Sequence, residues 1–215
     1  MSPTCLCHGE VMQIYTDRLF TTMVTMVTQH HSLYAKIPPQ GIFFEALAEK
    51  AFHLSGSLDA HIARTTANAP THDLMVGEER VSLKTETGRN TRPNSISITK
   101  LCTTEREPWN AETLIERTCS HLARYDLMLM LRAIWGEQAI HYQLIDIPLD
   151  LLRLIEHCQL QEVGNRQGRK SLGGDIIIND ETAFHVHFDG SDGKCQIRNL
   201  RLERCQILGE WDQRF

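Results

Sequence analysis

The chain has 215 residues, of which 41% are hydrophobic, and its formal net charge is −5. This hydrophobic share is typical of a folded globular protein and excludes disorder for most of the chain. The longest apolar runs, such as residues 127–131, are far shorter than the ~20 residues of a membrane helix, which excludes an integral helical membrane protein.

The N-terminal residues and the cysteines indicate a compartment. The opening MSPTCLCHGEV has no basic segment followed by an apolar stretch, so we expect a cytoplasmic protein without a secretion signal. The seven cysteines are scattered irregularly along the chain, which argues against a disulfide framework and predicts reduced thiols.

Two helices are predicted in the first quarter of the chain. The first runs from about Thr16 to Tyr34, and the Pro38-Pro39 pair ends any helical pattern after it. The second begins after Gly41, because apolar residues recur there at helical spacing as far as residue 54.

A β-hairpin follows at residues 74–86. A short apolar strand, a Gly77-Glu78 turn and a second strand make up this pattern. Ser82, Lys84 and Glu86 alternate with apolar residues in the second strand, so period-two geometry places these three side chains on one face.

The rest of the chain alternates between strands and helices. We expect strands at 95–101, at 127–135 and at 139–147 around a Gly136-Glu137 turn, and at 175–180, 182–188 and 194–200. Asn110 is expected to cap a helix that ends near Arg124, and a short helix follows Pro148. The pattern predicts an α/β fold with a mixed central sheet flanked by helices and β-rich C-terminal additions.

The hairpin places a carboxylate beside the polar row of its second strand. Asp73 precedes Ser82 by nine residues, so the turn folds it back toward Ser82 and Lys84, with Glu86 beyond them. Carboxylate oxygens bind Mg²⁺, which also accepts phosphate oxygens as ligands. An ammonium group nearby can orient a water molecule, and together these groups would stabilise the charge of a phosphodiester under attack.

These residues resemble the motif of the PD-(D/E)XK nucleases, the superfamily that includes most type II restriction endonucleases. In that family a helix supplies an acid, which Glu45 in FFEALAEKA matches. Asp73 matches the aspartate before the hairpin, and Ser82-Leu83-Lys84 matches the D/E-x-K strand. The chain departs from the motif at Ser82, where a second carboxylate is usual. The resemblance covers residues 41–147 and implies a restriction-endonuclease-like fold.

The resemblance implies a type II restriction endonuclease that cleaves double-stranded DNA with Mg²⁺ and leaves 5′-phosphate ends. Asp73 would ligate the metal ion and Lys84 would position the attacking water. Glu45 would complete or bridge the metal site, with Glu86 as a reserve ligand. Ser82 would hold a water or a phosphate oxygen through its hydroxyl. A homodimer is expected, because two identical sites related by a twofold axis would cut both strands of a palindrome.

Two basic loops and one strand hold candidates for DNA contacts. Residues 80–106 contain six basic and two acidic side chains, and the glycine-flanked loop 164–174 is basic without an acid. Strand 194–200 alternates polar side chains that can read base edges in the major groove. The predicted DNA-contacting residues are Arg89, Asn90, Arg92, Arg166, Arg169, Lys170, Lys194, Gln196, Arg198 and Asn199.

We expect one domain over residues 1–215. Its parts are an N-terminal helical segment (1–40), a catalytic core (41–160) and a β-rich DNA-contacting region (161–215).

Three other functions remain open at the level of sequence. A strand-nicking repair endonuclease of the same fold would have a similar strand and would stop at an open-circle plasmid. A non-catalytic DNA-binding module would bind DNA equally well in EDTA and never cut it. A metal-independent structural protein would leave the Asp73, Lys84 and Glu86 cluster without a purpose.

Some further motifs have simpler interpretations. Cys5-x-Cys7-His8 lacks the second ligand pair of a structural zinc site and is interpreted as part of an irregular terminus. His185 and His187 point to one strand face, where no adjacent acid is evident in the sequence. We interpret them as a polar strand face.

Overall fold

The computed structural model describes residues 14–56, 73–104, 108–164 and 170–215. The helices are α1 (Asp17–Tyr34), α2 (Ile42–Ser55), α3 (Ala111–Leu122) and α4 (Leu149–Arg153). The strands are β1 (Leu74–Val76), β2 (Glu79–Glu86), β3 (Ser95–Thr103), β4 (Leu127–Trp135), β5 (Ala139–Asp146), β6 (Gln161–Val163), β7 (Ser171–Ile178), β8 (Glu181–Asp189), β9 (Lys194–Arg201) and β10 (Gln206–Arg214). No helix in these ranges has the length and hydropathy needed to span a membrane.

Local sequence explains where the long helices begin. Thr16 caps α1 by accepting a hydrogen bond from the Leu19 N–H, and α1 ends at Ala35, which has a positive φ of 47°. Asn110 caps α3 in the same way through the Thr113 N–H, as its sequence position predicts.

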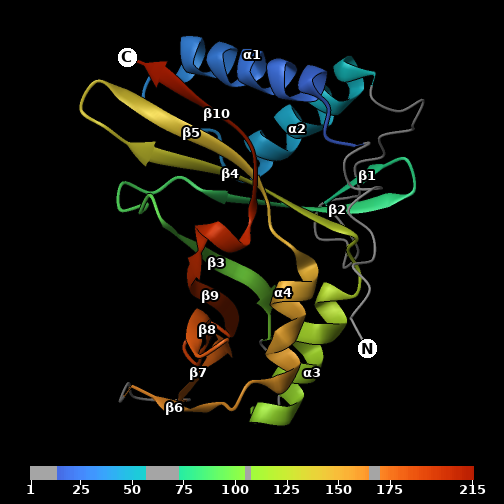
Figure 1. Cartoon of the computed structure of the whole chain (residues 1–215), viewed down its shortest axis with the longest axis vertical. Helices are drawn as coiled ribbons and strands as arrows, with labels where there is room; N and C mark the ends of the chain where they lie inside the picture. The colour runs from blue at the N-terminus through green and yellow to red at the C-terminus, as the bar shows by residue number, and fades with distance from the viewer. Residues whose placement is uncertain (1–13, 57–72, 105–107, 165–169) are drawn as a thin grey trace.

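The strands form two five-stranded sheets. Sheet A has the order β1-β2-β4-β5-β10, with β2 and β4 parallel and the other pairs antiparallel. Sheet B is antiparallel in the order β3-β9-β8-β7-β6. In Figure 1, α1 and α2 lie along one side of sheet A, while α3 and α4 pack beside sheet B.

Each face of sheet A belongs to a separate hydrophobic core. Alternate residues of β4 and β5, such as Leu129 and Tyr142, pack with α1 and α2. Those between them, such as Met130 and Ile145, pack with α3, α4 and the strands of sheet B. Ser82 and Lys84 of β2 lie on this second face, so the chemistry-bearing row lies between the two sheets.

The mixed α/β class with a β-rich C-terminal part is confirmed, but the strands differ from the prediction in several details. Strand β6 was not predicted, and β7 begins at Ser171, within the stretch expected to be a loop. One central sheet was expected, but β3 leaves the hairpin's sheet, pairs with β9 and starts sheet B. Strand β10 was not predicted, because it is a half-exposed edge strand with a bulge at Leu208 and polar residues that blur the period-two pattern.

Candidate active site

The hairpin itself fixes the carboxylate of Asp73. The Asp73 N–H donates to the Val81 carbonyl, which continues the β1–β2 pairing by one residue. Its Oδ2 accepts hydrogen bonds from the Leu83 N–H at 2.7 Å and from the Ser82 hydroxyl at 3.2 Å. Ser82 is fully buried, so its hydroxyl supports Asp73 rather than holding a water or a phosphate oxygen as expected.

Lys84 lies beside this carboxylate in a buried setting. Its Nζ is 3.7 Å from Asp73 Oδ2, and its side chain is 16% exposed. Burial lowers the pKa of Lys84, although the nearby charges of Asp73 and Glu45 favour the charged form. The ammonium therefore gives up its proton more easily than an exposed lysine does.

Glu45 approaches the pair from a different element. It lies in the first turn of α2 and lines the same cavity, of about 600 Å³, as Asp73 and Lys84. The structure thus brings together three of the five predicted catalytic side chains around one open space, with Ser82 directly behind them.

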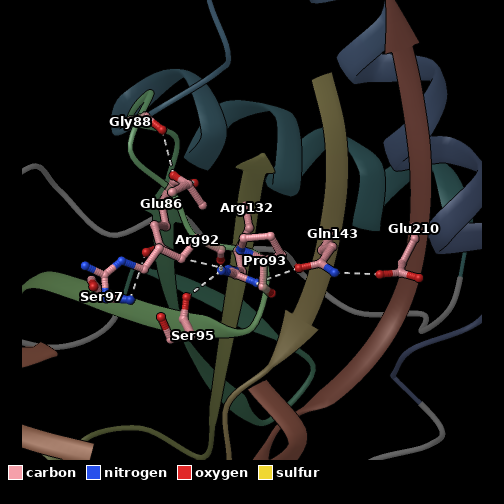
Figure 2. Close-up of polar contacts among 10 residues, drawn as sticks. Glu86, Gly88, Arg92, Pro93, Ser95, Ser97, Arg132, Gln143 and Glu210 are labelled. Atoms are coloured by element: carbon pink, nitrogen blue, oxygen red, sulfur yellow. Dashed lines mark hydrogen bonds and ion pairs between the residues drawn. The ribbon is translucent and has the colours of Figure 1, made fainter. Parts of the chain in front are cut away.

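Glu86, the expected reserve ligand, is engaged elsewhere. Its Oε2 accepts from Arg132 Nε at 2.8 Å and its Oε1 from the Ser97 N–H at 2.9 Å (Figure 2). Period-two geometry does place it on the face of Lys84, but its strand neighbour is an arginine, which takes the carboxylate. Glu86 does not line the Asp73 cavity.

The residues suit a hard cation with few protein ligands. Within the described ranges, no group of three or more His, Cys, Asp or Glu side chains is arranged to hold a metal ion. Asp73 and Glu45 are two carboxylates on one open cavity, which matches Mg²⁺, because this ion keeps several waters and adds phosphate ligands. The donor set fits this cofactor.

Among the cavity residues that were missed at the level of sequence, Tyr125 and His121 have strongly shifted pKa values. Tyr125 lines the cavity and hydrogen-bonds with Ser82, and its burial near Asp73 raises its pKa to about 12. His121 lines it too, and burial together with the Lys84 and Arg124 charges lowers its pKa to about 4. At neutral pH, Tyr125 is therefore a phenol and His121 a neutral imidazole. They follow β2 by some forty residues and carry no local motif.

Some of the predicted DNA-contacting residues meet in a second cavity of about 340 Å³, which we call the recognition groove. The β2–β3 loop contributes Asn90 and Arg92, and β9 contributes Gln196, Arg198 and Asn199. Arg198 donates to Gln196 Oε1 through both Nε and Nη2, at 3.1 and 2.7 Å. The recognition groove and the Asp73 cavity share Ile98 and Thr99 of β3, so they are neighbours.

The other predicted DNA contacts lie apart from this groove. Arg89 lies over the Trp135 ring, 4.7 Å from its centroid. Lys170 pairs with Glu162, and Lys194 pairs with Asp192. The predicted contacts Arg166 and Arg169 lie outside the described residues, as do Cys5, Cys7 and His8.

An acid that the sequence did not reveal lies next to the histidine pair of β8. His185 Nδ1 is 2.8 Å from Asp175 Oδ1 of β7, the strand that pairs with β8. The pairing of β7 with β8 brings the two together, which local spacing does not indicate.

Comparison with known proteins gives a consistent result. A family model described as SmaI, type II site-specific deoxyribonuclease, matches residues 1–213. The type II restriction enzyme SmaI of Serratia marcescens is 30% identical over 209 residues, which cover 95% of this chain and 80% of that enzyme. No solved structure matches.

Proposed function

The chain belongs to the SmaI family of type II site-specific deoxyribonucleases, and we propose that the Asp73 cavity is its catalytic centre. One observation carries this proposal: the β2 backbone and Ser82 hold the Asp73 carboxylate, with the Lys84 ammonium 3.7 Å away on the same open cavity. A carboxylate and an ammonium on a cavity wall are the groups that a phosphodiester under attack requires.

Asp73 and Glu45 would hold a Mg²⁺ ion at this centre. In the described part of the chain, the hydrogen bonds to Asp73 use Oδ2, so Oδ1 would be available as a metal ligand. When bound, the ion would act as a Lewis acid and neutralise charge on the scissile phosphate.

Lys84 would orient the attacking water. Its lowered pKa favours proton exchange with that water, because the buried ammonium is held less firmly in its charged form. In-line attack of the water on phosphorus would form the new P–O bond and break the bond to the 3′ oxygen. The attacking water would release its proton to solvent and the departing 3′ oxygen would take one up from solvent, leaving a 5′-phosphate and a 3′-hydroxyl. Tyr125 and Ser82 keep the Asp73 carboxylate in place during this step.

The recognition groove would receive the DNA next to the catalytic cavity. Arg92 and Arg198 can contact phosphates or guanine edges, and Asn90 and Gln196 can pair with adenine edges. The groove lies beside the cavity, so a duplex bound there would present its backbone to Asp73.

We also propose a homodimer acting in the cytoplasm. Two copies related by a twofold axis would place one cavity on each strand of a palindromic site. Sedimentation of the protein on its cleavage site tests the stoichiometry, and a single bound copy would contradict it.

A cleavage assay tests the catalytic assignment. Purified protein is incubated with unmethylated bacteriophage DNA in Mg²⁺ or in EDTA, and the ends of the products are sequenced. We expect discrete fragments with 5′-phosphates in Mg²⁺ alone. Cleavage in EDTA would contradict the metal, and single-strand nicks alone in a supercoiled plasmid would indicate a nickase.

A further inference from the structure

Arg132 is a fully buried cation inside an apolar strand. It interrupts the run LMLMLRAIW of β4, and its side chain is 0% exposed. Burying a charged group is costly unless other groups pair with it and accept its hydrogen bonds. The surroundings of Arg132 must therefore offset that cost.

Every N–H group of the Arg132 guanidinium has an acceptor, as Figure 2 shows. Its Nε donates to Glu86, and Nη1 donates to the Gln143 side chain at 2.5 Å and to the Pro93 carbonyl at 3.3 Å. Its Nη2 donates to the carbonyls of Arg92 at 2.6 Å and Ser95 at 2.7 Å. These bonds use all five donors of a guanidinium.

The side-chain partners form a row across sheet A. Glu86, Arg132, Gln143 and Glu210 occupy register positions opposite one another on β2, β4, β5 and β10. Gln143 extends the row to β10, because its Nε2 donates a hydrogen bond to Glu210 Oε1 at 2.6 Å. The row thus ties the guanidinium to the sheet, which makes it a rigid anchor.

The backbone partners belong to the β2–β3 loop, residues 87–94, and to the start of β3. Arg132 bonds three carbonyls between residues 92 and 95, and Trp135 Nε1 donates to the Thr87 carbonyl at 3.1 Å. Strand β4 therefore holds the loop at both of its ends. Glu86 adds a further tie, because its Oε1 accepts from the Ser97 N–H in β3.

This loop carries one wall of the recognition groove. Asn90 and Arg92 face the groove from the loop, opposite Gln196 and Arg198 of β9. A loop that is already ordered loses less conformational entropy when DNA binds, and it presents its side chains in one geometry.

We propose that Arg132 is a positioning residue for target-site selection, which holds the β2–β3 loop so that Asn90 and Arg92 meet the DNA in a fixed place. This inference rests on the proposed function of the recognition groove. Arg132 does not touch the DNA, and it acts through the loop whose carbonyls it binds.

Steady-state cleavage of a short duplex tests the proposal. The duplex carries the wild-type cleavage site, mapped from sequenced ends, and matched duplexes carry one altered base pair. For Arg132→Met and Glu86→Gln we expect KM to rise about tenfold and discrimination against the altered duplexes to fall about tenfold. We expect kcat on the intact site to stay within about threefold of the wild type in both variants. The KM of Arg132→Lys should lie between that of the wild type and that of Arg132→Met.

Hydrogen exchange of the loop amides separates positioning from general destabilisation. In Arg132→Met and Glu86→Gln, residues 88–94 should exchange faster than in the wild type while the strands of sheet B stay protected. Tyr142→Phe is the matched control, because it removes a buried hydrogen bond to His31 on the opposite face of sheet A. It should leave KM, discrimination and loop exchange unchanged. If Arg132→Met does not fold, loop exchange in Glu86→Gln carries the test, because Glu86 also lines the recognition groove and its KM alone does not separate positioning from direct DNA contact.

The outcomes distinguish this inference from the proposed function. If Arg198→Ala leaves KM and discrimination at wild-type values, the DNA-binding role of the groove and the positioning role of Arg132 are both overturned, while the Asp73 assignment stands on its own cleavage assay. If Arg198→Ala raises KM but Arg132→Met and Glu86→Gln do not, the positioning role alone is overturned. A loss of kcat with unchanged KM in these two variants would also overturn it.

Discussion

Lys84 and Arg132 are two cations on the same face of sheet A, in strands that pair directly, but their surroundings differ. Lys84 Nζ lies 3.7 Å from Asp73 at the edge of an open cavity. Arg132 is fully buried, and all five of its N–H donors are hydrogen-bonded. A fully bonded cation has nothing left to offer a substrate, whereas a buried lysine with a lowered pKa on a cavity does.

The two acids on the same face differ in the same way. The Asp73 side chain is 31% exposed and has an oxygen to spare, while Glu86 is 11% exposed and bonded through both oxygens. We therefore propose that the pair Asp73 and Lys84 forms the reactive end of this face. The pair Glu86 and Arg132 forms its structural end.

Asp73→Asn should give the largest effect on cleavage. A variant that cleaves normally would contradict the contrast between the Asp73–Lys84 pair and the Glu86–Arg132 pair. We expect single-turnover cleavage at saturating Mg²⁺ to fall about 10³-fold, because a neutral amide binds Mg²⁺ poorly and stabilises less charge. The melting temperature should hardly change, because the amide oxygen can still accept from Leu83. Asp150→Asn, at an exposed position, is the control and should cleave normally.

Arg132→Met should give the next largest effect, on stability. It leaves Glu86 buried without its cation and three carbonyls without their donors, which we expect to cost about 3 kcal/mol of the free energy of unfolding. Urea denaturation measures it. An unchanged midpoint would mean that the structural end does not stabilise the fold.

Lys84→Met sharpens the contrast, because the two buried cations should respond oppositely to the same substitution. Cleavage should fall about 10²-fold, since the attacking water loses its orienting group. The melting temperature should stay or rise, because a costly buried charge is removed. A loss of stability as large as that of Arg132→Met would contradict this contrast.

The gain in stability from Lys84→Met should depend on pH. A lowered pKa in the folded state means that the unfolded chain binds more protons between the folded pKa and the ordinary lysine value. Wild-type stability therefore recovers as pH rises through that window, and the cost of the buried charge is fully present below it. Melting curves in EDTA should show the advantage of Lys84→Met at neutral pH and its decline at alkaline pH.

Tyr125→Phe should give the smallest effect. It removes the hydroxyl that bonds Ser82 but keeps the ring, so we expect about 1 kcal/mol of stability to be lost and cleavage to fall about threefold. The same melting and single-turnover assays apply. A loss as large as that of Asp73→Asn would make Tyr125 a direct participant in the reaction.

The sequence was sufficient wherever a local pattern determines the structure. The hairpin with Asp73 and Lys84, and the cap of α3 at Asn110, follow from turn residues, alternation and capping chemistry over a few positions. The helix that carries Glu45 was placed in the same way.

The sequence was insufficient wherever the answer depends on which strands become neighbours. Glu86 was correctly placed on the face of Lys84, but only the pairing of β2 with β4 shows that Arg132 neutralises it. Tyr125 reaches the site because α3 returns the chain to the start of β4. The sequence does contain one indication of Arg132's role, because it is a single charged residue inside an apolar strand. This pattern predicts a buried partner for the charge, but it does not identify that partner.

The position of β3 has a consequence for how the chain folds. This strand lies in sequence between two strands of sheet A, yet it is a member of sheet B, where Thr103 pairs with Lys194. Neither sheet is therefore a continuous stretch of chain, and sheet B cannot close until distant segments have met. Such non-local pairing slows folding, so we expect the two sheets to form in one slow cooperative step. Separating the chain near residue 160 should leave neither half folded.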